Sequence, residues 1–125
     1  MTGRIVHFEV PYEDGERART FYREAFGWNL SEMPEMGYTM VTTGPVDEQG
    51  RPTEPGYING GMFQRTEDLT RPVLTLDVPD IDATLKAVES LGGEPVREKM
   101  AVGDMGYAAY FKDPEGNILG LWQSA

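Results

Sequence analysis

The chain has no cysteine and only one histidine, His7, among its 125 residues. Without cysteine there is no disulfide framework, no thiolate nucleophile and no metal site with cysteine ligands. No apolar run approaches the roughly 20 residues that a membrane-spanning helix needs. The first residues lead directly into a strand pattern with no apolar signal region, so we expect a cytoplasmic protein that does not bind membranes.

Positive charge is also scarce, with 11 basic against 21 acidic residues and a net charge of −10. A field of this sign repels phosphate backbones, which argues against nucleic acid as a partner. The same field would attract a cationic ligand. A second interpretation is that the acidic surface only keeps a small protein soluble.

The sequence repeats itself once. The block Val6–Pro11 returns as Leu74–Pro79 at an offset of 68, and Glu24–Trp28 returns as Glu89–Gly93 at an offset of 65. A third pair, Gly60–Gln64 and Leu119–Gln123, is offset by 59. Similar blocks in the same order indicate two copies of one supersecondary module. We expect a single domain over residues 1–125, with modules at about 4–65 and 71–124.

Each module is expected to contain a strand, a helix and three further strands. The ranges expected in the first module are 4–10, 15–26, 28–33, 38–43 and 57–64. Asp14 and Gly27 are typical residues at the start and end of the helix. The ranges expected in the second module are 72–78, a helix capped by Asp80, 95–100, 107–112 and 117–123. The loop 44–56 is rich in proline and glycine, and it would act either as a flap or as a disordered hairpin tip.

Alternation along the first strand of each module separates two faces. The apolar rows Val6, Phe8, Val10 and Leu74, Leu76, Val78 should pack against the helices. The opposite rows are Ile5, His7, Glu9 and Val73, Thr75, Asp77. They mix polar and apolar groups, which suits a ligand cavity formed by the two modules. Exposure of these rows to solvent is the alternative.

Pairing across the turn Asp113–Gly116 would place Lys112 opposite Asn117. Ala109 would then lie beside Gly120, and Tyr107 beside Trp122, on the face that lines the cavity. The predicted cavity residues are His7, Glu9, Tyr38, Asn59, Gly61, Thr75, Asp77, Tyr107, Phe111, Gly120 and Trp122. A glycine in a strand also occurs at bulges and close backbone contacts, so the gap at Gly120 has a purely structural interpretation.

The modules and their motifs resemble the vicinal oxygen chelate superfamily, in particular its uncharacterised glyoxalase-related branch. That superfamily includes glyoxalase I, bleomycin-resistance proteins and extradiol dioxygenases. The motifs are the doubled module, Phe21-Tyr22…Phe26-Gly27, Asn59-Gly60-Gly61, Asp113–Asn117 and Gly120–Gln123. The resemblance implies an α+β fold of two βαβββ modules, the glyoxalase/bleomycin-resistance-like fold, in which mixed sheets enclose a cavity. By analogy, and because exposed strand edges need cover, we expect a homodimer.

The resemblance also implies four positions for metal ligands, on the first and last strand of each module. The last-strand positions fall on Gly61 and Gly120, and a first-strand position falls near Val73. None of the three has a side chain that coordinates metal. The remaining position is His7 or Ile5, depending on the alignment. We therefore expect no divalent metal and no other cofactor.

Three functional hypotheses follow. The first is a small-molecule-binding protein of the glyoxalase/bleomycin-resistance type without the metal centre, whose ligand is cationic or aromatic. The second is a glyoxalase-like lyase or isomerase, or another enzyme, that uses His7 and Glu9 as catalytic acid and base in the same cavity. The third is a structural or interaction module. Whether the chain is an enzyme stays open at this point.

Overall fold

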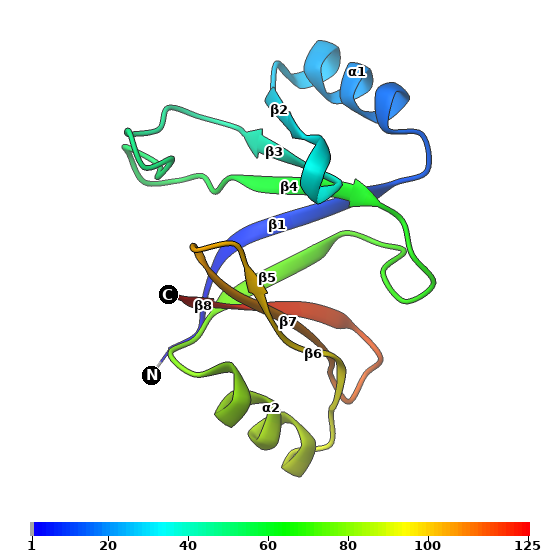
Figure 1. The fold of residues 1–125 in the computed structure, drawn as a ribbon, viewed down its shortest axis with the longest axis vertical. Helices are drawn as coiled ribbons and strands as arrows, with labels where there is room; N and C mark the ends of the chain where they lie inside the picture. Colours follow the sequence, from blue (N-terminus) through cyan, green and yellow to red (C-terminus); the bar gives the residue numbers. More distant parts are fainter. Residues whose placement is uncertain (1) are drawn as a thin grey trace. The chain divides into compact units, whose positions relative to one another are not determined.

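The computed structural model describes residues 2–125, which form eight strands, two α-helices and one short 3-10 helix (Figure 1). In chain order these are β1 (Arg4–Tyr12), α1 (Gly15–Phe26), β2 (Asn29–Met33), η1 (Pro34–Met36), β3 (Tyr38–Thr42), β4 (Gly60–Gln64), β5 (Val73–Asp77), α2 (Ile81–Ser90), β6 (Glu94–Val102), β7 (Gly106–Lys112) and β8 (Ile118–Ser124). The chain divides into two compact units. We call residues 7–72 the first unit, and residues 73–125 together with residues 2–6 the second unit.

Both units have the same strand plan, which confirms the doubled βαβββ module. In the first unit the strand order is β2-β3-β4-β1, and β1 runs parallel to β4 with Glu9 opposite Gly61. In the second unit the order is β5-β8-β7-β6, and β5 runs parallel to β8 with Thr75 opposite Gly120. The remaining pairs in each unit are antiparallel. The expected α+β fold is therefore confirmed.

The helix ends follow the sequence signals. The Asp14 carboxylate accepts a hydrogen bond from the backbone N–H of Arg17, and the Asp80 carboxylate accepts one from that of Ala83. These side chains satisfy donors that have no partner inside the first turn. After α1 the chain turns at Gly27, whose φ of 71° is in the left-handed region that glycine adopts without strain.

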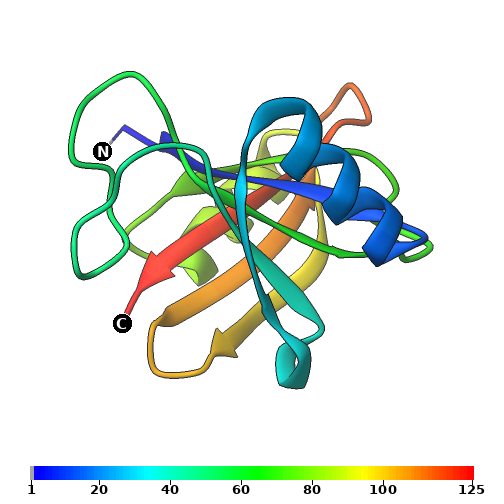
Figure 2. The same cartoon turned by 90° about the horizontal axis from the view of Figure 1, so that it is seen from above.

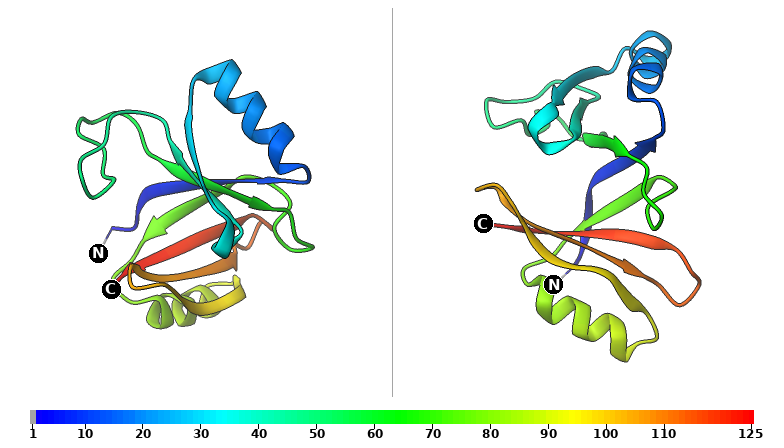
Figure 3. Two further views of the ribbon diagram at one scale, coloured as in Figure 1. Left: turned by 45° about the horizontal axis from the view of Figure 1, so that its top comes forward. Right: turned by 45° about the vertical axis from the view of Figure 1, so that its right-hand side comes forward.

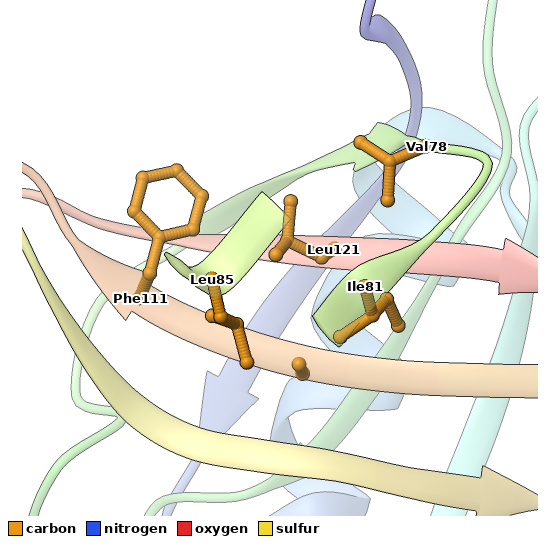
Figure 4. Close-up of a cluster of buried hydrophobic side chains, with 6 residues drawn as sticks. Val78, Ile81, Leu85, Phe111 and Leu121 are labelled. Carbon is orange, nitrogen blue, oxygen red and sulfur yellow. The ribbon is translucent and has the colours of Figure 1, made fainter. Parts of the chain in front are cut away.

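The core of the second unit lies between α2 and one face of its sheet. Val78, Ile81, Leu85, Ala109, Phe111 and Leu121 form one buried cluster (Figure 4). The helix runs along this face of the sheet (Figures 1 and 3). Leu76 and Val78 contact the cluster as predicted for the apolar row of β5, whereas Leu74 is exposed.

The first unit is packed differently, because α1 has no buried residue. The helix lies beside β2 (Figures 1 and 3). Its apolar face is instead covered by aromatic rings from its own neighbourhood: the Tyr22 ring stacks on Trp28 at 4.6 Å between centroids, and Phe26 lies 6.2 Å from Tyr22. Phe26 nevertheless remains 64% exposed. The expectation that the first-strand row packs fully under this helix is wrong for Val6, which is exposed.

The hairpin between β7 and β8 differs from the prediction by one residue. Lys112 lies opposite Ile118, not Asn117, because Asp113 pairs with Asn117 through a backbone hydrogen bond of 2.8 Å. Gly116, with a φ of 87°, adds one residue to the turn. A slip of one residue moves every side chain of the partner strand to the other face.

The long loop between β3 and β4 is folded on itself beyond the ends of those strands (Figures 1 and 2). The Asp47 carboxylate accepts hydrogen bonds from the backbone N–H groups of Gln49 and Arg51, and the Tyr57 hydroxyl donates to the Pro45 carbonyl. These contacts join residues within the loop. Its role as a flap stays a prediction.

Candidate functional site

Three polar side chains meet on one face of the first unit's sheet. His7 and Glu9 are on β1 two residues apart, so both point to the same side. The Tyr38 hydroxyl, from β3, lies 2.8 Å from His7 Nε2 and donates a hydrogen bond of 2.8 Å to Glu9 Oε2. Because a phenol has one proton and Tyr38 donates it to Glu9, the oxygen of Tyr38 accepts from His7 Nε2–H. We call this group the His7–Tyr38–Glu9 cluster.

The Tyr38 hydroxyl also occupies the space above Gly61 on β4. A Cβ atom at position 61 would lie 1.8 Å from the Tyr38 hydroxyl oxygen, well inside van der Waals contact. The Tyr38 ring stacks beside Phe63 at 6.5 Å between centroids. The missing side chain of Gly61 thus makes room for a phenol from the neighbouring strand, and two aromatic rings border the cluster.

Burial changes the protonation of His7. Desolvation lowers the pKa of His7 below its ordinary value of 6.5, and the negative charge of Glu9 opposes this to a smaller extent. The imidazole is therefore neutral at pH 7. This agrees with a single proton on Nε2 that is donated to Tyr38.

This pKa predicts how stability depends on pH. As pH falls below 6.5, the unfolded chain binds a proton at His7 before the folded chain does, so the free energy of unfolding decreases. The His7→Gln variant keeps an amide donor but does not titrate, so it loses this contribution. Urea unfolding of both proteins at pH 7.5 and pH 5.5 should show a larger acid-induced decrease for the wild type. Equal decreases would contradict the buried neutral histidine.

Asn59 lies just before β4 and has one buried polar atom without a partner. Its Oδ1 accepts a hydrogen bond of 2.8 Å from the backbone N–H of Thr43, whereas its Nδ2 is buried and has no hydrogen-bond partner. A buried donor without a partner costs free energy, on the order of 1–3 kcal/mol. A bound acceptor atom would remove that cost.

In the second unit, the predicted residues fall on two opposite faces. Thr75 lies opposite Gly120, and Gly120 lies opposite Tyr110, so these three residues share one face. Asp77 and Trp122 are paired on the same face one rung further. This is the face opposite the buried cluster around α2, as predicted for Thr75, Asp77, Gly120 and Trp122.

Tyr107 and Phe111 were predicted for that polar face, and this prediction is wrong. Both side chains pack with the hydrophobic cluster on α2. The cause is the one-residue slip at Gly116, which exchanges the odd and even positions of β7 relative to β8. Tyr110 takes the predicted aromatic position, and Ala108 lies opposite Trp122.

The sequence does not predict that Arg97 joins Tyr110 on the polar face of the second unit. Its guanidinium lies over the Tyr110 ring, 5.7 Å from the ring centre. Two irregularities in the pairing of β6 with β7 stand on either side of Arg97, one after Pro95 and one before Met100. A β-bulge turns a side chain to the other face of its strand, and no periodicity in the sequence reveals where one occurs.

A metal centre of the type implied by the resemblance does not fit these residues. Within residues 2–125, no three His, Asp or Glu side chains come together as a set that could hold a metal ion. The Tyr38 hydroxyl fills the space at Gly61, and a Cβ at Gly120 would lie 2.8 Å from Thr75 Oγ1. His7, the one imidazole, has Nε2 engaged with Tyr38.

The comparisons with known proteins agree with the fold. Residues 4–44 match the family model for the bleomycin resistance protein-like N-terminal region. A Vibrio parahaemolyticus protein described as a probable lactoylglutathione lyase is 33% identical over 127 residues, which cover 98% of this chain and 91% of that protein.

Two solved structures share the fold. A single-residue variant of Streptomyces coelicolor methylmalonyl-CoA epimerase, in complex with 2-nitronate-propionyl-CoA, has a TM-score of 0.65 at 16% identity, and the match covers 100% of this chain and 96% of that chain. A superfamily member from Vibrio splendidus has a TM-score of 0.62 at 17% identity, with coverages of 99% and 100%. No described helix is long and apolar enough to span a membrane. The chain belongs to the glyoxalase/bleomycin resistance protein/dioxygenase superfamily.

Proposed function

We propose that this chain binds a small aromatic molecule without a superfamily metal centre, on the sheet face that carries the His7–Tyr38–Glu9 cluster. The main observation behind the proposal is that the Tyr38 hydroxyl takes the place of a side chain at Gly61. The ligand position implied by the family has no side chain, and the Tyr38 hydroxyl fills its space. This hydroxyl is itself held at 2.8 Å by both His7 and Glu9.

Two further features support an aromatic ligand with a hydrogen-bond acceptor. The stacked rings of Tyr38 and Phe63 offer π faces beside the cluster. The unpaired Asn59 Nδ2 can donate to an oxygen or nitrogen of the ligand. The net charge of −10 favours a cation over an anion at this face.

A panel of planar aromatic cations, such as ethidium, and neutral aromatics of similar size tests this proposal. At least one compound is expected to raise the melting temperature, and Asn59→Ala should weaken its binding about tenfold through loss of the donor. Asn29→Ala, an exposed asparagine on β2, is the matched control and should bind as the wild type does. Failure of every compound to stabilise the protein would count against a binding role.

The hydrogen-bonded chain from His7 through Tyr38 to Glu9 favours a second candidate, an enzyme that moves protons. Glu9 would remove a proton from a carbon acid, while Tyr38 or His7 would donate one to the developing oxyanion. The relationship to a probable lactoylglutathione lyase makes the hemithioacetal of methylglyoxal and glutathione the natural substrate to test.

Turnover separates the two candidates. The binding proposal predicts no conversion of the hemithioacetal, with or without added Zn²⁺ or Ni²⁺. Conversion that Glu9→Gln abolishes, in a variant that keeps the wild-type melting temperature, would replace the binding proposal with the enzymatic one.

A further inference from the structure

The two helices of the repeat differ at the positions that attach a helix to its sheet. Asp14 and Asp80 cap α1 and α2, so the helices can be compared position by position from their caps. In α2 the first and fifth residues after the cap are Ile81 and Leu85, which are 0% and 3% exposed. In α1 the corresponding residues are Gly15 and Arg19.

At these positions α1 therefore contacts its sheet through polar groups, whereas α2 contacts its sheet through apolar side chains. Arg19 forms an ion pair of 3.3 Å with Glu32 and lies over the Tyr12 ring at 5.8 Å. It also donates a long hydrogen bond of 3.5 Å to Thr39 Oγ1. These contacts hold α1 beside the sheet through polar groups, and no residue of α1 is buried as Ile81 and Leu85 are in α2.

The first unit has a cavity of about 380 Å³ between α1 and the end of β1, and neither Gly15 nor Arg19 lines it. Binding sites for small molecules usually have volumes of about 300–1,000 Å³. The cavity shares no residue with the His7–Tyr38–Glu9 cluster. Its walls therefore define a separate candidate site.

The walls of this cavity combine apolar side chains with charged groups of both signs. Val10, Ala18, Phe21 and Tyr22 supply the apolar part, and the Phe21 and Tyr22 rings lie at 84° to each other. Arg17 and Arg65 supply the positive charge.

The acidic residues at the cavity are already engaged. Arg65 donates to Glu13 at 2.7 Å, and the Asp14 carboxylate accepts from the backbone of Arg17. Within residues 2–125 the Arg17 guanidinium has no hydrogen-bond or ion-pair partner, so its charge is available to a ligand.

We propose that this cavity is a second binding site, for small aromatic carboxylates. The ring of the ligand would pack against Phe21 and Tyr22, and its carboxylate would pair with Arg17, whose planar guanidinium suits a carboxylate. Of the two carboxylates at the cavity, Glu13 is paired with Arg65 and Asp14 caps α1. Negative charges more than about 8 Å away are largely screened at physiological salt.

The experiment follows backbone amide shifts of ¹⁵N-labelled full-length protein during titration with indole-3-acetate and with its neutral analogue indole-3-acetamide. Both probes should shift residues 10–22, and the acid should bind more tightly. The Arg17→Gln variant should weaken binding of the acid about fivefold and leave binding of the amide unchanged. Arg23→Gln removes a charge from the same helix away from the cavity, and it should bind both probes as the wild type does.

The Ala18→Leu variant tests the cavity itself. A leucine side chain at position 18 adds apolar volume to the cavity wall, so binding of both probes should be lost while the melting temperature stays the same or rises. A lower melting temperature with retained binding would overturn the proposal. So would an absence of shifts in residues 10–22 at millimolar probe, or an equal loss of acid binding in the Arg17 and Arg23 variants.

Discussion

Replacing Leu121 by alanine is expected to lower the free energy of unfolding by about 3 kcal/mol. Leu121 is on β8, is 1% exposed, and belongs to the buried cluster that joins β7 and β8 to α2 (Figure 4). Truncation removes its apolar contacts and leaves a cavity that rigid strands on both sides cannot close. Urea unfolding followed by circular dichroism measures the change.

Leu91 provides the matched control. It follows α2, is 77% exposed, and the same substitution there should change stability by less than about 0.5 kcal/mol. If Leu121→Ala and Leu91→Ala had equal effects, the buried cluster would not be the main source of stability in the second unit.

The second large effect is expected at Gly61. An alanine at position 61 places a Cβ atom 1.8 Å from the Tyr38 hydroxyl oxygen, so the phenol must leave its position between His7 and Glu9. The backbone is not the cause, because the φ of Gly61 is outside the left-handed region. The displaced hydroxyl loses two partly buried hydrogen bonds, and we expect Gly61→Ala to cost about 2–4 kcal/mol.

A double-mutant cycle isolates this contact. In a Tyr38→Ala background the space above position 61 is empty, so adding Gly61→Ala should cost less than about 1 kcal/mol. Unfolding measured for the two single variants and the double variant gives the coupling. An equal cost of Gly61→Ala in both backgrounds would show that Tyr38 does not occupy this space.

Local signals in the sequence predicted the elements well. The aspartates at 14 and 80 and the glycine at 27 are at the ends of the helices because each satisfies a backbone requirement of its own turn. The internal repeat identified the two modules for a similar reason: both copies have kept the short motifs. Parity along β1 placed His7 and Glu9 on one face, where Tyr38 joins them.

The register between paired strands was predicted less accurately than the elements, because a single extra residue in a turn shifts the whole register. The motif Asp113–Gly116 predicts a four-residue turn, but the left-handed Gly116 lengthens the loop by one residue. Tyr107 and Phe111 consequently pack on α2. Arg97 depends in the same way on bulges in β6, which leave no trace in the pattern of apolar residues.

The exposure of α1 could not be predicted from the sequence, for a different reason. Its apolar positions repeat as in a buried amphipathic helix, which predicts a buried face. The cap-based alignment of the two modules shows that Gly15 and Arg19 stand where Ile81 and Leu85 attach α2. The sequence does not show that these two positions decide whether a helix is buried. That becomes clear only when the buried residues of α1 and α2 are compared.

The central proposal is that the Tyr38 hydroxyl, held by His7 and Glu9, stands in place of a metal centre. Because His7 is the single histidine, long-range ¹H–¹⁵N spectra of its imidazole report on that group alone. At pH 7 the proposal predicts a neutral ring with its proton on Nε2, and no change in its ¹⁵N shifts on addition of equimolar Zn²⁺. A stoichiometric shift of the Nε2 resonance on addition of Zn²⁺ would contradict it.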